Sequence, residues 1–336
     1  MRTEGRKASG VIGSPDMTEI RREPESRDGL IVSEGLSFRA LVESVDSLGQ
    51  LPSDVACVPL HEPVLKVFTP EQPMLRLEEP LSVLPAGAMH NRETPFGMDR
   101  RIVWMAEHPG SIDALVDQLC ESVADVHRFN AIHRNHLVDM HFFKIPEVNG
   151  NGLYFGFFLA EAVCRDDHWK QIEKLARHYR WKERCLSCDM ISDEHQQPLQ
   201  TSRTVYIDGA VTAFVPYTAS SPYEVVILPM NHVSDFSHLD RDQRRGIKET
   251  LTRIVPAIAD ISGPDGFEIY LRTQPLIPRH GYPEFLRGAD LADVYHTGLT
   301  VRSCKGAQRI PGTERYINPV QPEHAAAELR TRISKY

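Results

Sequence analysis

Long apolar runs are missing from this 336-residue chain. No stretch approaches the roughly 18 apolar residues that a membrane-spanning helix requires, so we expect no association with a membrane. The N-terminal segment MRTEGRKASGVIGSPDMTEIRREPESRDG also lacks the apolar middle of a secretory signal. We therefore expect a cytoplasmic protein in which residues 1–30 form a flexible, charged N-terminus.

Positive charge is scarce, since 38 lysines and arginines face 46 aspartates and glutamates, for a formal net charge of -8. Binding to a nucleic-acid backbone depends on basic groups that neutralise phosphates, so we expect no nucleic-acid partner. The chain is long enough for a sizeable core and for two domains of ordinary size.

Cysteine is scarce as well: six residues are too few for a disulfide scaffold. Two of them, Cys185 and Cys188, form a C-x-x-C whose thiolates can point at one tetrahedral metal ion, which then needs two more ligands. The alternative is a redox pair, which favours a C-x-x-C that opens a helix between two strands. Because the sequence continues with a polar stretch and then a hairpin, we favour the metal.

Two histidines could complete such a set of ligands. His232 follows the apolar run 225–229, which predicts a buried strand, and His296 lies in DVYHTGLTV, whose alternation predicts a later strand. If the sheet brings these strands together, the four side chains form a Cys2His2 site typical of zinc. The alternative is that each is an ordinary hydrogen-bonded histidine.

A duplication becomes visible when two parts of the chain are compared. Segment 95–129 reads as a strand, His108 and a long helix, and segment 222–261 repeats this order with His232. Asp240 is a suitable N-cap for the second helix. Apolar residues with helical spacing support both helices: Leu115, Leu119 and Val123 in the first, and Ile247, Leu251, Ile254, Ile258 and Ile261 in the second.

Strand hairpins precede both units. TVYIDGAVTAFVP (204–216) places two short strands around an Asp-Gly turn, and MLRLEEPLSVLPA (74–86) is a weaker counterpart. Hairpins followed by helices, without regular strand-helix-strand alternation, indicate an α+β fold with antiparallel sheets. We predict two half-units at 31–165 and 185–336, joined by a helical linker at 166–184.

Three stretches resemble the histidine triad superfamily, specifically its galactose-1-phosphate uridylyltransferase branch: CLSCDMI, TAFVPYTASSPYEVVILPMNHVSDFSHL and RYINPVQPEHAAAELR. The resemblance is detailed from Cys185 to Arg330 and concerns only the order of elements from about 60 to 165. It implies two tandem histidine-triad-like half-units, each an antiparallel sheet with packed helices, in a protein of nucleotidyltransferase ancestry. A homodimer is a further implication.

The resemblance also implies a structural zinc ion held by Cys185, Cys188, His232 and His296. Members that transfer nucleotides carry a second histidine two residues after the first, and its imidazole attacks the α-phosphorus to form a covalent nucleotidyl intermediate. In this chain that position is Gly298.

The first half-unit does not supply the missing histidine. Its segment 148–161 reads VNGNGLYFGFFLAE, with Gly156 and Phe158 where the family often has histidines. No second C-x-x-C accompanies His108, so we expect no matching zinc site there. Nucleotidyl transfer by the usual mechanism is therefore not expected.

A second alignment shifts the motif by two residues. It makes His296 the catalytic nucleophile and Val294 the position of the lost first histidine. Zinc would then lack one ligand, for which Cys304 or His280 are substitutes.

Two further groups of polar residues qualify as candidate sites. Asp139 and His141 share one face if their segment is extended, which suggests a catalytic acid-base pair or, with the neighbouring His133 and His136, a second metal site. The alternative is a loop that enters a strand.

The second group, Arg272, Arg279 and His280, follows the predicted strand FEIYLR, where a substrate or cofactor loop of the family would lie. Arginine holds phosphate or carboxylate with two parallel hydrogen bonds. The alternative is that these are ordinary surface residues.

Three functions follow. The first is an enzyme with altered chemistry on a phosphorylated or otherwise anionic small molecule, such as a nucleotide or sugar phosphate. The second is a catalytically silent member that binds a metabolite or a partner chain. The third is an active nucleotidyltransferase that uses His296 or a histidine of the segment 133–141.

Overall fold

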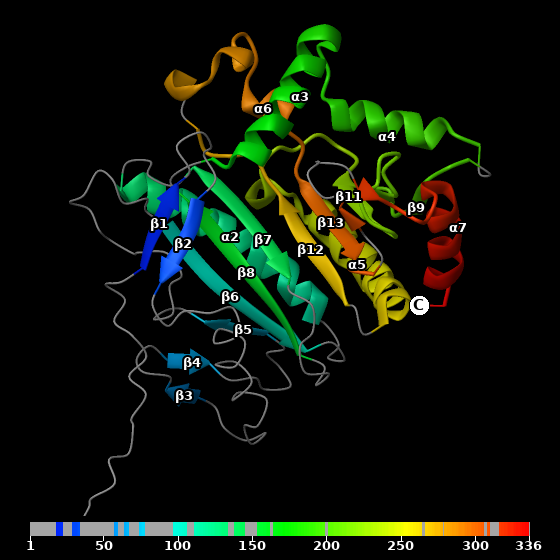
Figure 1. Ribbon diagram of the computed structural model, residues 1–336, viewed down its shortest axis with the longest axis horizontal. Helices are drawn as coiled ribbons and strands as arrows, with labels where there is room; N and C mark the ends of the chain where they lie inside the picture. Colours follow the sequence, from blue (N-terminus) through cyan, green and yellow to red (C-terminus); the bar gives the residue numbers. More distant parts are fainter. Residues whose placement is uncertain are drawn as a thin grey trace, which may run out of the picture.

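The structure is a computed structural model (Figure 1). It describes six N-terminal strands and then most of the chain from residue 111 onward. The described ranges are 18–22, 29–33, 57–59, 64–66, 74–77, 97–105, 111–133, 138–144, 153–161, 164–198, 201–263, 266–277, 279–305, 308–309 and 316–335.

The main sheet has nine strands in the order β5-β6-β8-β7-β12-β13-β11-β10-β9. From the first half they are β5 (Met74–Leu77), β6 (Gly97–Met105), β7 (Asp139–Lys144) and β8 (Leu153–Glu161). From the second half they are β9 (Thr204–Ile207), β10 (Val211–Phe214), β11 (Val225–Pro229), β12 (Phe267–Arg272) and β13 (Gly298–Ser303).

The predicted α+β class with antiparallel pairing is confirmed, and the two half-units share one sheet. All pairings within this sheet are antiparallel, and β7 meets β12 where Phe143 lies opposite Tyr270. Four strands from before residue 162 thus continue into five strands from after residue 203. The sequence did not predict this junction.

Two long helices, α2 (Ser111–His133) and α5 (Arg241–Ser262), pack on the sheet and share one hydrophobic core with both groups of strands (Figure 1). The predicted helix at 240–261 is confirmed. Asp240 accepts from the backbone N–H of Gln243 at 2.8 Å, and the Gln243 side chain accepts from the Asp240 N–H at 2.9 Å. This capping box fixes the start of α5 because it satisfies two amides that a helix leaves unpaired.

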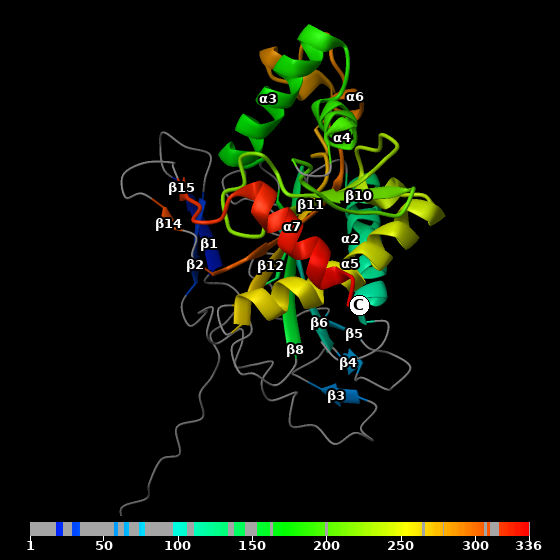
Figure 2. The ribbon, with the colours of Figure 1, turned by 90° about the vertical axis from the view of Figure 1, so that its right-hand side faces the viewer.

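The remaining helices lie at the edges of the sheet. α3 (Asp166–Lys182), α4 (Leu186–Gln196) and α6 (Leu291–Val294) gather beyond one end of the strands in both views (Figures 1 and 2). α7 (Pro322–Ile333) packs against α5 and β9. None of the described helices is long and apolar enough to cross a membrane.

Two local predictions were wrong. DVYHTGLTV does not form one strand, because Asp290 caps α6 by accepting from the Ala292 N–H at 3.2 Å, and β13 begins only at Gly298. The C-x-x-C was expected to precede a polar stretch, but it opens helix α4, with Cys185 as the N-cap and Cys188 in the first turn. α4 is held by Ile191, which packs on an apolar patch of Phe214, Val226 and Leu228. The composition of the α4 segment alone does not reveal this contact.

Some predictions reach beyond the described residues. The hairpin at 204–216 is confirmed as β9 and β10, whereas its counterpart at 74–86 is described only at β5, which pairs with β6. Of the segment 1–30, the structure describes β1 (Thr18–Arg22) and the start of β2 (Gly29–Ser33), which pair antiparallel. The other residues of that segment lie outside the description.

Candidate metal centre and neighbouring polar groups

Four predicted ligands meet at the end of the sheet where α4 and α6 lie. Cys185 and Cys188 open α4, His232 follows β11, and His296 lies between α6 and β13. Their ligand atoms all lie within 4.8 Å of one another. The fold therefore brings together side chains that are up to 111 residues apart in sequence.

The distances within this group suit a tetrahedral ion. The Nδ1 atom of His296 lies 3.5 Å from Sγ of Cys188 and 3.9 Å from Sγ of Cys185, and Nδ1 of His232 lies 3.4 Å from Sγ of Cys188. Sulfur and nitrogen ligands on one tetrahedral zinc ion stand about 3.6 Å apart, given the usual bond lengths. The donor set and its spacing thus fit zinc.

Both imidazoles are oriented by backbone carbonyls. Nε2 of His232 donates to the carbonyl oxygen of Ala292 at 2.7 Å, and Nε2 of His296 donates to that of Pro229 at 3.0 Å. Since a carbonyl oxygen only accepts, each Nε2 carries the proton, and the Nδ1 lone pair faces the thiols. Such an orienting hydrogen bond is typical of histidines that bind metals.

The two thiols affect each other's pKa. The proximity of Cys188 lowers the pKa of the Cys185 thiol, whereas Cys185 and burial raise the pKa of the Cys188 thiol. A metal ligand must be a thiolate, so binding a metal here should release a proton.

Gly298, the position of the expected nucleophile, has no room for a side chain. A Cβ at Gly298 would overlap the backbone carbonyl oxygen of Ile227 and lie 2.7 Å from Cδ2 of Leu228. Paired strands ordinarily leave room for a Cβ, but next to the pair of Leu299 with Ile227 the backbone of β11 comes closer to Gly298 than strand pairing requires. The glycine is therefore required by close approach of the backbone of β11.

Phe158 and Gly156, the corresponding positions of the first half, lie in β8. Phe158 is completely buried in the main core. The preceding residues 148–152 lie outside the described ones. Of the other two histidines of the predicted cluster, His133 is the last residue of α2, and His136 lies outside the described residues.

Asp139 lies at the start of β7, two residues before His141, with which it was expected to pair. The side chain that it contacts instead is the imidazole of His168 in α3. Oδ1 of the completely buried Asp139 accepts from Nδ1 of His168 at 2.7 Å, and Nε2 of His168 accepts from the hydroxyl of Tyr295 at 3.0 Å. Arg165 donates its backbone N–H to Oδ2 of Asp139 at 3.0 Å. These hydrogen bonds connect Asp139 of the first half, through His168, with Tyr295 of the second half, the residue before His296.

Burial by itself raises the pKa of Asp139, but the contacts with His168 and Arg165 together outweigh it, so the pKa is held far below its usual range. The sequence reading missed His168 because it treated 166–184 only as a linker. The histidine stands three residues into a predicted helix, where nothing local marks it as a partner for a distant aspartate.

Replacing His168 with leucine should lower the free energy of unfolding by about 3 kcal/mol or more at neutral pH, because a buried carboxylate loses its main partner. The ionised Asp139 stabilises the fold above its unfolded pKa of about 3.9. The deficit relative to wild type should therefore shrink as the pH falls and the carboxyl can take a proton. Denaturant unfolding at several pH values measures this.

Arg177→Leu is the surface control for that measurement. Arg177 makes an exposed ion pair with Glu173 at 3.2 Å, so its loss should change stability by less than about 0.5 kcal/mol. Equal effects of the two substitutions would contradict the role given to His168.

The three residues predicted to hold an anion lie at the end of β12 and in a short 3-10 helix. Arg279 is 81% exposed and forms an ion pair with Asp290. Arg272 ends β12, and its carbonyl oxygen accepts from the Thr297 hydroxyl at 2.5 Å. His280 lies in a short 3-10 helix with Arg279.

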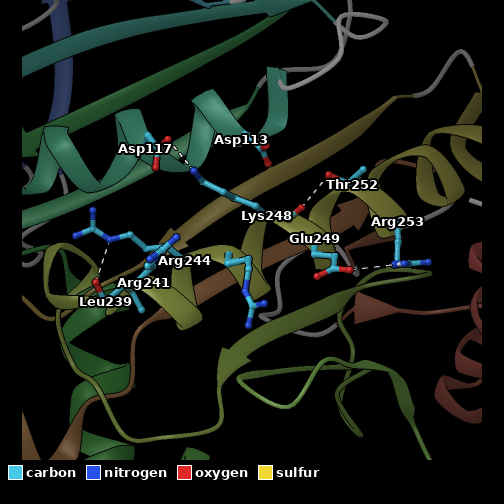
Figure 3. A pocket seen from close by; sticks show the side chains of 10 residues that line it. Asp113, Asp117, Leu239, Arg241, Arg244, Lys248, Glu249, Thr252 and Arg253 are labelled. Carbon is cyan, nitrogen blue, oxygen red and sulfur yellow. Dashed lines mark hydrogen bonds and ion pairs between the residues drawn. The ribbon is translucent and has the colours of Figure 1, made fainter.

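A wide hollow of about 870 Å³ lies between α2 and α5 and contains none of the predicted site residues (Figure 3). Its charges are largely paired: Lys248 contacts Asp117 at 2.7 Å, and Arg253 contacts Glu249 at 3.8 Å. Arg244 donates to the carbonyl oxygen of Leu239 at 2.9 Å. Of these contacts, the ion pair of Lys248 with Asp117 joins the two helices, and the others lie within α5 or at its start.

Comparison with known proteins agrees with the sequence resemblance. The chain is 23% identical over 335 residues to galactose-1-phosphate uridylyltransferase of Thermotoga maritima, covering 94% of this chain and 98% of the relative. No protein-family model matches the chain.

Solved structures share its fold. A uridylyltransferase superposes with a TM-score of 0.64 at 17% identity, over 94% of this chain and 99% of the other. An ADP-glucose phosphorylase from Arabidopsis thaliana superposes with a TM-score of 0.59 at 18% identity, over 93% and 98% of the two chains. The predicted resemblance to galactose-1-phosphate uridylyltransferases is therefore confirmed, and the solved structures show a shared fold.

Proposed function

We propose that this chain, similar in sequence and fold to galactose-1-phosphate uridylyltransferases, is a zinc-stabilised relative that acts on a phosphorylated or otherwise anionic small molecule without a covalent histidyl intermediate. The names of the relatives, a sugar-phosphate uridylyltransferase and an ADP-glucose phosphorylase, support this ligand class. The proposal rests on two motif positions: both ring nitrogens of His296 face other groups, and Gly298 has no room for a side chain.

His296 is a ligand in this proposal and not a nucleophile. Its side chain is 1% exposed, Nδ1 faces two thiols and Nε2 donates to Pro229. A nucleophilic imidazole needs a lone pair that can reach the phosphorus atom. Neither nitrogen of His296 offers one, and Gly298 offers no side chain.

Zinc would be held by Cys185, Cys188, His232 and His296. Four protein ligands complete a tetrahedral shell, which is the arrangement of structural rather than catalytic zinc sites. Bound there, the ion would clamp α4 to the loop after β11 and to the start of β13.

The silent alternative, a protein that binds a metabolite or a partner without turnover, is supported by one observation. Arg279, which we expected to bind an anion, is engaged by Asp290. Screening for turnover of nucleotide sugars and sugar phosphates separates the two functions, because only the enzyme consumes its ligand.

Native mass spectrometry near neutral pH, after incubation with a panel of nucleotide sugars, tests the central claim. We expect a mass that corresponds to one zinc ion per chain and no stable gain of a nucleoside monophosphate, because no histidine of the motif is free to attack. Near-neutral conditions are needed because phosphohistidine bonds are labile in acid. A covalent nucleotidyl adduct would overturn the proposal and direct mapping to the remaining histidines.

A further inference from the structure

A smaller hollow of about 310 Å³ opens between the end of α2, the loop after β12 and the segment that precedes α6. Its volume lies at the lower end of the range of roughly 300–1,000 Å³ that is usual for ligand pockets. Both halves of the chain contribute to it, and none of the four candidate zinc ligands lines it.

A histidine held by a buried carboxylate lines this hollow. Oδ2 of Asp235, which is completely buried, accepts from Nε2 of His127 at 2.7 Å. Oδ1 of Asp235 accepts from the backbone N–H of Ser237 at 2.8 Å and from its hydroxyl at 2.6 Å. The carboxylate is therefore fixed, and it orients the imidazole of His127.

The second nitrogen of His127 is free. Because Asp235 keeps the proton on Nε2, Nδ1 of the neutral imidazole is an acceptor, and among the described residues no hydrogen bond reaches it. The hydrogen bond that His127 donates to the Asp235 carboxylate raises the pKa of His127, although burial opposes this. Nδ1 can therefore accept a hydrogen bond from a ligand.

A second acceptor in the hollow lacks a partner. Oε1 of Gln274 is buried and accepts no hydrogen bond in the described structure, while the backbone N–H of Gln274 donates to Ser234 at 3.0 Å. A buried polar atom without a partner destabilises a fold, so such atoms usually have one in the functional state. A ligand that donates to Oε1 would satisfy it.

The lining selects the ligand by its hydrogen-bond donors. It offers two acceptors without a partner among the described residues, Nδ1 of His127 and Oε1 of Gln274, beside apolar side chains such as Leu276 and Leu291, while the carboxylate of Asp290 is already paired with Arg279. Acceptors call for O–H donors, and a phosphate group, which mainly accepts, would leave them unsatisfied. We propose that this hollow binds a small neutral polyhydroxylated molecule, with one hydroxyl donating to His127 and another to Gln274.

The Asp235–His127 pair makes this site an acceptor for hydroxyl groups. The bound hydroxyl keeps its proton and donates it in a hydrogen bond to Nδ1, while Asp235 holds the other ring nitrogen in its N–H form. This inference does not depend on zinc or on the proposed function.

The test observes the His127 ring by NMR of the full, metal-loaded chain with labelled histidine. The probes are glucose, galactose, myo-inositol and glycerol, against inorganic phosphate and ethanolamine. We expect at least one neutral polyol to shift the His127 signals saturably, and neither charged probe to do so. Signals that no polyol shifts, or that phosphate or ethanolamine shifts instead, would overturn the assignment.

Gln274→Met separates a ligand contact from a structural one. It should weaken polyol binding at least about tenfold, a loss of about 1.4 kcal/mol, while Tm stays unchanged or rises because an unpaired acceptor is removed. Gln118→Met is the matched control, because Oε1 of Gln118 on α2 is also buried without a partner but does not line this hollow. Unchanged affinity in Gln274→Met, or an equal loss in Gln118→Met, would refute the proposal.

Discussion

Cys185→Ala is expected to abolish stoichiometric zinc binding and to lower the free energy of unfolding by several kcal/mol. Cys185 is buried at the N-cap of α4, and its Sγ lies 3.9 Å from Nδ1 of His296. The free energy of binding to a structural zinc site is part of the folding free energy and reaches about 10–16 kcal/mol in zinc-finger peptides. Loss of one thiolate should therefore loosen α4, the turn at His232 and the start of β13.

Two measurements check this expectation: metal content by elemental analysis and thermal unfolding with and without a chelator. Wild-type protein should lose stability on chelation, whereas the variant, which already lacks the ion, should change little. Cys304→Ala is the control thiol, since Cys304 is outside the group of four, and it should retain the metal. If Cys185→Ala kept both its metal and its stability, the zinc site would be refuted.

Gly298→His, which restores the apparent motif, is expected to destabilise the protein without creating a transferase. Any Cβ at Gly298 would overlap the carbonyl oxygen of Ile227, and β11 cannot move away because it is a central strand, paired with β13 and β10. Overpacking of a well-packed core typically costs about 1–3 kcal/mol, and a backbone obstacle relaxes less than a side chain does. Native mass spectrometry should again show no nucleotidyl adduct.

Gly298→Ala isolates the steric part of this effect, because alanine adds only the Cβ. Gly246→Ala is the comparison: the new Cβ would lie 2.7 Å from Oδ2 of Asp208 and 2.8 Å from Cγ2 of Val211, which are side-chain rather than backbone atoms. Alanine also favours the interior of helix α5 over glycine by roughly 1 kcal/mol. A Tm loss in Gly298→Ala no larger than in Gly246→Ala would contradict the close-approach argument, and an adduct in Gly298→His would contradict the functional one.

The sequence by itself determined the local elements and the chemistry that they carry. The periodicity of Ile247, Leu251, Ile254 and Ile258 predicted α5, and the Asp-Gly turn predicted the hairpin of β9 and β10, because helix faces and turns depend on neighbouring residues. The C-x-x-C and the two histidines were named as one group, and the fold brings them within 4.8 Å; zinc itself stays a prediction.

Only the tertiary structure decided how distant parts meet. The junction of β7 with β12, the contact of Asp139 with His168 and that of His127 with Asp235 join residues whose local patterns give no sign of a partner. The tertiary structure also decided whether position 298 can hold a side chain. A glycine reads as a lost histidine in the sequence, but the approach of Ile227 shows that packing of β13 on β11 leaves no space for a side chain.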